Sequence, residues 1–169
     1  MTDWIQPLFF EDNLDNNVLD LSARDNDVII TLKERWHNDF LSGVKKFEFR
    51  RKFSKKKPKR IVIYVGGEVR SICAIGFCGV PIFGNPDYVI QYASSLGAAP
   101  NPESLFRYFN GRHEVCAIPV EKYVPLFPPI DSELLSALAP DFTPPQSYTY
   151  VERYEGLKQY LMDTKVWKE

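Results

Sequence analysis

Short apolar runs alternate with polar segments along the chain, and they predict a series of strands. The β-branched runs at residues 28–32 and 60–65 are typical of buried strands. A longer apolar run at 69–80 predicts a further strand. Gly66 and Gly67 separate the last two runs, and a glycine pair between strands favours a tight hairpin.

Helical spacing is clearest in residues 34–42. Trp36 and Phe40 lie four residues apart and would share the inner face of a short helix. Gly43 follows at the position where glycine commonly ends a helix. The sequence therefore predicts a strand, a helix and then several strands.

The second half of the chain mixes both periods. Its expected elements are helices at 85–97 and 102–110, a strand at 113–124, a proline-rich connector with a short helix at 127–140 capped by Asp131 or Ser132, a strand at 144–151 and a helix at 152–163. This order favours an α+β fold, a small mixed β-barrel with flanking helices, over a doubly wound sheet. We expect one domain at 27–151, with an acidic N-terminal arm at 1–26 and a C-terminal helix at 152–169.

Composition is consistent with a folded core, but charge is distributed unevenly. The chain has 169 residues, of which 44% are hydrophobic, and a formal net charge of −1. Residues 1–27 contain seven acidic residues and one arginine, whereas residues 43–60 contain ten basic residues and only one acidic residue, Glu48. A basic patch attracts polyanions whatever the net charge. The acidic arm would then fold over the basic face and compete with nucleic acid.

Several classes of protein do not fit the sequence. No apolar run approaches the length that spans a bilayer, and the acidic N-terminus does not resemble a secretory signal. We therefore expect a cytoplasmic protein that does not bind membranes. Cys73, Cys78 and Cys116 lack the spacing and histidines of a zinc site, so we expect buried free thiols in strands and neither metal nor cofactor.

Residues 45–51, KKFEFRR, alternate charged and aromatic side chains, which predicts a half-buried strand. Phe47 and Phe49 would face a core, and Glu48 and Arg50 would share the opposite face. That polar face has two interpretations. It is an exposed ladder of ion pairs, or it is a polar floor where a carboxylate accepts from a base and arginine donates to carbonyl or phosphate oxygens.

The spacing of these residues resembles a known motif. Gly43-x-Lys45-x-x-Glu48-x-Arg50 matches the GxKxxExR signature of the ASCH domain family, relatives of the PUA-type RNA-binding barrels. A short strand and a helix precede the motif, two apolar strands follow it, and PPQSYTY resembles the closing strand of ASCH proteins described as candidate transcriptional regulators. The resemblance covers about residues 27–151.

The resemblance implies a PUA-like β-barrel with a cleft beside the motif, and nucleic-acid or modified-nucleobase binding there. Lys45, Glu48 and Arg50 would line the cleft, and Gly43 would shape the turn. Strict alternation points Lys45 away from Glu48, unless Lys45 precedes the regular ladder. One branch of the family is similar to amidohydrolases that deacylate N4-acetylcytidine, but that branch has threonine where this chain has Glu48.

The lysines that follow the motif also have two interpretations. They form an ordinary solvated turn, or they hold phosphates while the cleft receives a base. The phosphate-binding candidates are Arg51, Lys55, Lys56 and Lys57. The candidate stacking residues, which otherwise belong to the core, are Trp36, Tyr64, Tyr148 and Tyr150.

Three functions are consistent with these features. The first is a regulatory binding module for RNA, single-stranded DNA or a modified nucleobase. The second is a small hydrolase, an amidohydrolase or nuclease, that acts on a modified nucleoside or RNA with Lys45 and Glu48 as its catalytic pair. The third is a protein-interaction domain that docks through its two charged patches. The two histidines, His37 and His113, are far apart in sequence, and each is expected to be structural or exposed.

Overall fold

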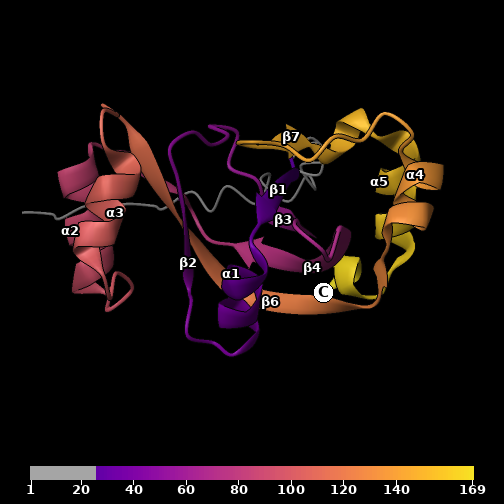
Figure 1. The fold of residues 1–169 in the computed structure, drawn as a ribbon, viewed down its shortest axis with the longest axis horizontal. Helices are drawn as coiled ribbons and strands as arrows, with labels where there is room; N and C mark the ends of the chain where they lie inside the picture. The colour runs from indigo at the N-terminus through magenta and orange to yellow at the C-terminus, as the bar shows by residue number, and fades with distance from the viewer. Residues whose placement is uncertain (1–25) are drawn as a thin grey trace, which may run out of the picture.

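The computed structural model describes residues 26–169, and its centre is a seven-stranded sheet that curls into a half-barrel (Figure 1). The strands are β1 (Val28–Leu32), β2 (Phe47–Arg50), β3 (Arg60–Val65), β4 (Ser71–Cys78), β5 (Ile82–Gly84), β6 (Val115–Ile130) and β7 (Thr149–Tyr150). The helices are α1 (Glu34–Leu41), α2 (Pro86–Ser95), α3 (Pro102–Phe109), α4 (Ser132–Leu138) and α5 (Glu155–Asp163). The expected α+β barrel with flanking helices is confirmed.

The long strand β6 connects the two parts of the sheet. The strand order is β2-β6-β4-β3-β1-β7, and β5 also pairs with β6. Pairing of β1 with β3 is parallel, and the other pairings are antiparallel. The first residues of β6 pair with β2 and β5, and the later ones pair with β4. In Figure 1, β6 runs from the α2–α3 end of the molecule to the α4–α5 end.

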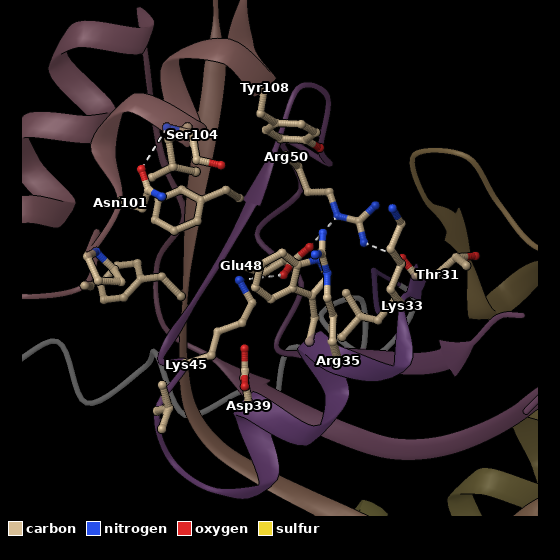
Figure 2. A pocket seen from close by; sticks show the side chains of 18 residues that line it. Thr31, Lys33, Arg35, Asp39, Lys45, Glu48, Arg50, Asn101, Ser104 and Tyr108 are labelled. Atoms are coloured by element: carbon tan, nitrogen blue, oxygen red, sulfur yellow. Dashed lines mark hydrogen bonds and ion pairs between the residues drawn. The ribbon is translucent and has the colours of Figure 1, made fainter.

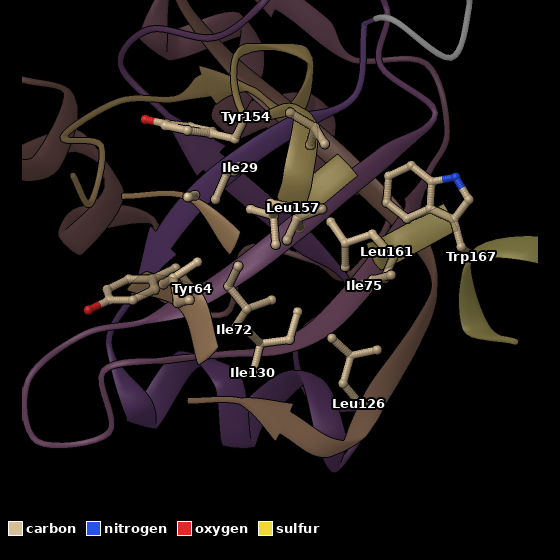
Figure 3. Packing of buried hydrophobic residues seen from close by; sticks show 14 residues of the cluster. Ile29, Tyr64, Ile72, Ile75, Leu126, Ile130, Tyr154, Leu157, Leu161 and Trp167 are labelled. Atoms are coloured by element: carbon tan, nitrogen blue, oxygen red, sulfur yellow. The ribbon is translucent and has the colours of Figure 1, made fainter. Parts of the chain in front are cut away.

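Both faces of the central strands are buried, which explains their continuous apolar runs. On one face, Ile29 of β1 and Val62 of β3 pack against Leu157 and Leu161 of α5 (Figure 3). The chain at Gly156 approaches α4 closely, because a Cβ atom there would lie 2.4 Å from the Leu138 carbonyl oxygen. The predicted C-terminal helix is therefore part of the core.

The other face of these strands forms the interior of the half-barrel. Val28 and Ile30 of β1 lie there, and Phe40 of α1 and Phe53 pack against the same cluster. A third apolar layer joins β2 to the helical end of the molecule. In this layer Phe47 and Phe49 pack with Phe109 of α3 and with residues of α2 and β6.

Three details differ from the sequence predictions. The first residues of the expected proline-rich connector, 127–130, are the end of β6, where Ile130 pairs with Ile72 of β4. Proline is tolerated because, within residues 26–169, this part of β6 pairs with β4 alone, so its other edge needs no N–H donors. The expected hairpin at Gly66 and Gly67 forms between antiparallel β3 and β4, but its turn is not tight, because the loop between Val65 and Ser71 spans residues 66–70. The final strand, expected at 144–151, contains only Thr149 and Tyr150.

The expected acidic arm lies almost entirely outside the described residues. Asp27 is described, and it is fully buried rather than part of an acidic surface. Its carboxylate accepts from the Arg60 backbone N–H at 2.9 Å and pairs with the Arg60 guanidinium at 3.1 Å. Arg60, the last residue of the basic stretch, is therefore a structural partner of Asp27.

The cysteines lie in strands, as predicted, but only Cys73 and Cys116 are buried, whereas Cys78 is partly exposed. Cys73 and Cys78 lie in β4 and Cys116 lies in β6, and all three are free thiols. Among residues 26–169, the structure contains no helix with the length and apolar character needed to cross a bilayer.

Candidate functional site

A pocket of about 420 Å³ opens at the seam of the half-barrel, between edge strand β2 and part of β1. β7 pairs with Val28 and Ile29 of β1, so among the described residues Thr31 and Leu32 have no strand partner on the β2 side. These two residues line one wall of the pocket, and residues of β2, α1 and α3 line the others (Figure 2). Its volume is in the usual range for small-molecule sites.

Glu48 lies at the centre of the pocket, between two cations. Its Oε1 is 2.9 Å from Arg50 Nε, and its Oε2 is 3.3 Å from Lys45 Nζ. Glu48 and Arg50 are only 6% and 7% exposed, so the interpretation as an exposed ladder is wrong. Lys45 reaches Glu48 because β2 begins at Phe47, and Lys45 therefore precedes the alternating ladder. The structure thus brings together the three charged residues of the motif.

Arg50 also ties the two sides of the seam together. Its Nη2 donates to the Thr31 carbonyl of β1 at 2.8 Å, and its Nη1 donates to the Ser147 carbonyl at 3.4 Å. Its Nε has no hydrogen-bond acceptor in the described chain, so the contact with Glu48 is an ion pair. A planar guanidinium with several donors suits this bridging position. Arg50 is therefore both part of the pocket wall and a structural link.

Aromatic rings surround the Lys45 ammonium. Its Nζ lies 5.3 Å from the ring centre of Trp36, 5.2 Å from that of Phe40 and 5.4 Å from that of Phe49. Such cation–π contacts hold the ammonium in place. Trp36 is 38% exposed at the pocket, and the Arg35 guanidinium lies 4.3 Å from its ring centre. The pocket therefore offers an indole and a guanidinium plane next to the buried carboxylate.

Helix α3 supplies the opposite wall through Asn101, Ser104 and Tyr108 (Figure 2). The Asn101 side chain caps the helix by accepting from the Ser104 N–H at 3.1 Å. Burial raises the pKa of Tyr108, so its phenol stays protonated as a donor. Sequence reasoning missed these residues. The spacing of Ser104 and Tyr108 indicates a shared helix face, but nothing local shows that this face meets β2.

A second pocket, also of about 420 Å³, lies beyond the end of β2. Apolar residues on its lining include Phe53, Phe83, Cys116, Tyr148 and Tyr150. Its charged residues are Arg51, Lys52, Lys55, Lys56 and Glu114. Lys55 pairs with Glu114 and also lies 3.9 Å from the Phe83 ring centre, while Lys56 lies 4.9 Å from that of Tyr150.

The remaining predicted residues fall into three groups. Gly43 has φ +78° after α1, a conformation that favours glycine and lets the chain turn towards Lys45. Lys57 lines neither pocket. Tyr64 takes the core position that was the alternative to stacking on a base, because it is 7% exposed and packs against Phe142. Of the other stacking candidates, Trp36 lines the first pocket, and both Tyr148 and Tyr150 line the second.

The histidines do not form a catalytic pair. His37 Nδ1 lies 2.6 Å from the Tyr123 hydroxyl oxygen, and burial lowers the pKa of His37. His113 is exposed and lines neither pocket. Within residues 26–169, no group of three or more His, Cys, Asp or Glu side chains could hold a metal ion.

Comparison with solved structures identifies the fold. The crystal structure of the ASCH protein from Zymomonas mobilis aligns with a TM-score of 0.71 and 23% sequence identity, covering 83% of this chain and 97% of that chain. The chain has the ASCH fold. A serine-to-alanine variant of that protein gives a TM-score of 0.70, and a tyrosine-to-phenylalanine variant gives 0.69. No protein-family model and no curated protein matches the sequence.

The ASCH fold agrees with the expectation drawn from the motif. In this chain Lys45, Glu48 and Arg50 of the motif line one pocket at the seam of the barrel. At 23% identity the likeness establishes the fold, whereas the chemistry of a site determines its ligand.

Proposed function

We propose that the protein binds single-stranded RNA or DNA and receives an unpaired or modified base in the pocket between β1 and β2. One observation carries this proposal. The buried Glu48 carboxylate lies in a pocket of about 420 Å³ that is also lined by Trp36 and Tyr108. The flat aromatic surfaces and the buried acceptor are the features used to hold a splayed-out base.

The polar groups of the pocket match the edge of a base. Each carboxylate oxygen of Glu48 contacts one cation, but a carboxylate has about four acceptor sites, so it can also accept from an exocyclic amino group. Lys45 retains further N–H donors for a carbonyl oxygen. A modified base would be distinguished by how it fits between these groups and the α3 wall. The proposed role is regulatory, in line with the resemblance of the PPQSYTY segment to candidate transcriptional regulators.

The charge around the pocket favours a polyanion. Its lining contains four basic residues, Lys33, Arg35, Lys45 and Arg50, against two acidic residues, Asp39 and Glu48. Arg51 lies at the boundary of the pocket, where its guanidinium is 4.6 Å from the Tyr108 ring centre. Phosphate contacts from such residues position a strand, while the pocket selects the base.

The proposal is tested by binding of labelled single-stranded RNA and DNA at low and physiological salt. Trp36→Leu removes the stacking surface from the pocket and should weaken binding by about fivefold or more. Tyr88→Leu is the matched control, because Tyr88 is an exposed aromatic residue that lines neither pocket. Equal affinities for the two variants, or no binding at low salt, would contradict the proposal.

A second candidate function uses the same pocket. Lys45 Nζ and Glu48 Oε2 are 3.3 Å apart, so the pair is placed for proton transfer in a hydrolase acting on a modified nucleoside or RNA. Glu48→Gln distinguishes the two functions. In a binding protein it changes which base is preferred, whereas in a hydrolase it abolishes turnover while binding persists. Incubation of candidate nucleosides and RNA with the wild type, followed by chromatography, detects any turnover.

A further inference from the structure

The second pocket combines the two surfaces that a nucleotide needs. Its apolar part includes the rings of Phe83, Tyr148 and Tyr150, and its charged part has four cations and one carboxylate. The carboxylate, Glu114, is already paired with Lys55. An aromatic surface beside an excess of positive charge is typical of sites for single-stranded nucleic acid.

The two pockets lie next to each other along β2. The first is lined by Glu48 and Arg50 within the strand, and the second is lined by Arg51 and Lys52 immediately after it. Arg51 belongs to the second pocket, while its guanidinium covers the ring of Tyr108 in the first. Residues of α1 line the first pocket, and Tyr150 of β7 lines the second. In Figure 1, α1 lies near the start of β2 and β7 lies towards its other end. A strand that occupies the first pocket can therefore continue past Arg51 into the second.

The lysines of the second pocket are arranged for exchange with a ligand. Lys56 contacts the Tyr150 ring, and Lys55 contacts the Phe83 ring. Cation–π contacts at exposed sites are weak, on the order of 0.5–1 kcal/mol. A phosphate can therefore attract the ammonium groups away from the rings, which leaves ring faces available for a base. Tyr148 adds a further ring, in edge contact with Tyr150.

We propose that this second pocket is a nucleotide subsite, which binds the base and phosphate of a neighbour of the nucleotide held in the first pocket. This inference rests on the proposed function and extends it. The smallest ligand that uses the whole site is then a dinucleotide, and recognition depends on two adjacent positions of the strand.

The experiment compares a 5′-phosphorylated mononucleotide, a dinucleotide and a hexanucleotide of the same base, by calorimetry at low salt. The full chain is used as wild type, Lys56→Gln, Lys57→Gln and Tyr148→Leu. Lys57 is the matched control, because it is the adjacent lysine, carries the same charge and lines neither pocket. The comparison therefore separates a specific subsite from general attraction by positive charge.

We expect the wild type to bind the dinucleotide at least about fivefold more tightly than the mononucleotide, which corresponds to stacking of one additional base. Lys56→Gln and Tyr148→Leu should reduce this advantage and leave mononucleotide binding unchanged, whereas Lys57→Gln should retain it. A dinucleotide that binds no more tightly than the mononucleotide overturns the subsite alone, as do equal effects of Lys56→Gln and Lys57→Gln. No binding of any of the three ligands overturns both the subsite and the proposed function.

Discussion

The basic stretch of the chain has two parts with opposite environments. In residues 45–50 the charged side chains of the motif are largely buried. Glu48 pairs with Lys45 and Arg50, and Arg50 also donates across the seam to the Thr31 carbonyl. In residues 51–57 the lysines are mostly exposed, and their partners are an exposed carboxylate and ring faces. The same residue types therefore serve different purposes a few positions apart.

The difference follows from the cost of removing a charge from water. A buried ion requires partners that compensate for its lost hydration, so the geometry of the first part is fixed. An exposed lysine loses little interaction free energy when it changes partner, because its contacts in water are weak. We infer that the first part determines what fits the pocket, whereas the second part contributes salt-dependent attraction.

The largest expected effect comes from disrupting the buried ion pairs of residues 45–50. Arg50→Met removes the link from β2 to β1 and leaves Glu48 with only Lys45. Loss of one partner of a buried ion pair typically costs about 3–5 kcal/mol, and the free energy of unfolding should fall by that order. Urea denaturation measures this change. Arg51→Met, which alters an exposed arginine, is the control, and a loss of equal size for both variants would contradict a structural role for Arg50.

The next effect concerns the exposed lysines of residues 51–57. Neutralising Lys52, Lys55 and Lys56 together as glutamine should lower affinity for single-stranded nucleic acid without changing the urea midpoint. Each lost phosphate contact should also reduce the slope of log K against log salt by about 0.7. Binding measured at several salt concentrations gives this slope. An unchanged slope would mean that these lysines only solvate the loop.

Local patterns were sufficient for much of the fold, because neighbouring residues decide them. The apolar run of β1, the helix α1 and the cap at Asp131 all have the predicted structure. The inner face predicted for α1 is only partly correct, because Phe40 is buried but Trp36 is 38% exposed. The alternation of residues in β2 correctly predicted which side chains share a face, but it did not predict which of the two faces is more buried. Phe47 and Phe49 are half-buried beneath α3, while Glu48 and Arg50 face the barrel interior.

Parts of the site depended on contacts that the sequence does not encode locally. The motif predicted Lys45, Glu48 and Arg50, and they do meet in one pocket. The α3 wall and the Arg50 bridge to Thr31 and Ser147 arise from residues distant in sequence. Tyr64 shows the same limit, since an aromatic residue in a strand has no local feature that separates a core position from a binding surface.

A smaller effect is expected in how the stability of the protein depends on pH. His37 lies on α1, which borders only the first pocket, and burial lowers its pKa from the usual value of 6.5. The unfolded chain therefore takes up a proton at higher pH than the folded chain. The stability contributed by neutral His37 is present above about pH 6.5 and is lost as the pH falls through the folded pKa.

The pH dependence of the urea midpoint between about pH 5 and 8 measures this contribution. His37→Gln should flatten the dependence, whereas His113→Gln, which alters an exposed histidine outside both pockets, should leave it unchanged. An identical profile for wild type and His37→Gln would remove His37 as the cause.

The smallest expected effect is that Cys116, in the lining of the second pocket, does not react with thiol reagents. Burial raises the pKa of Cys116 to about 12, and burial also raises the pKa of Cys78 to about 12. Thiol reagents act on the thiolate, so neither cysteine should react at about pH 8 while the chain is folded. Absorbance with a disulfide reagent, with and without urea, measures this. Rapid modification of Cys116 in the folded protein would show that the second pocket is more open at its base than the structure indicates.

The length of β6 has a consequence for how the protein loses its structure. Residues 115–119 of this strand pair with β2 and β5 at the two pockets, and later residues pair with β4 beside the α5 core. One continuous strand thus belongs to both halves of the molecule, so neither half can open without disturbing the other's pairing. We expect a single cooperative unfolding transition, with amide protons at both ends of β6 exchanging through the same global opening.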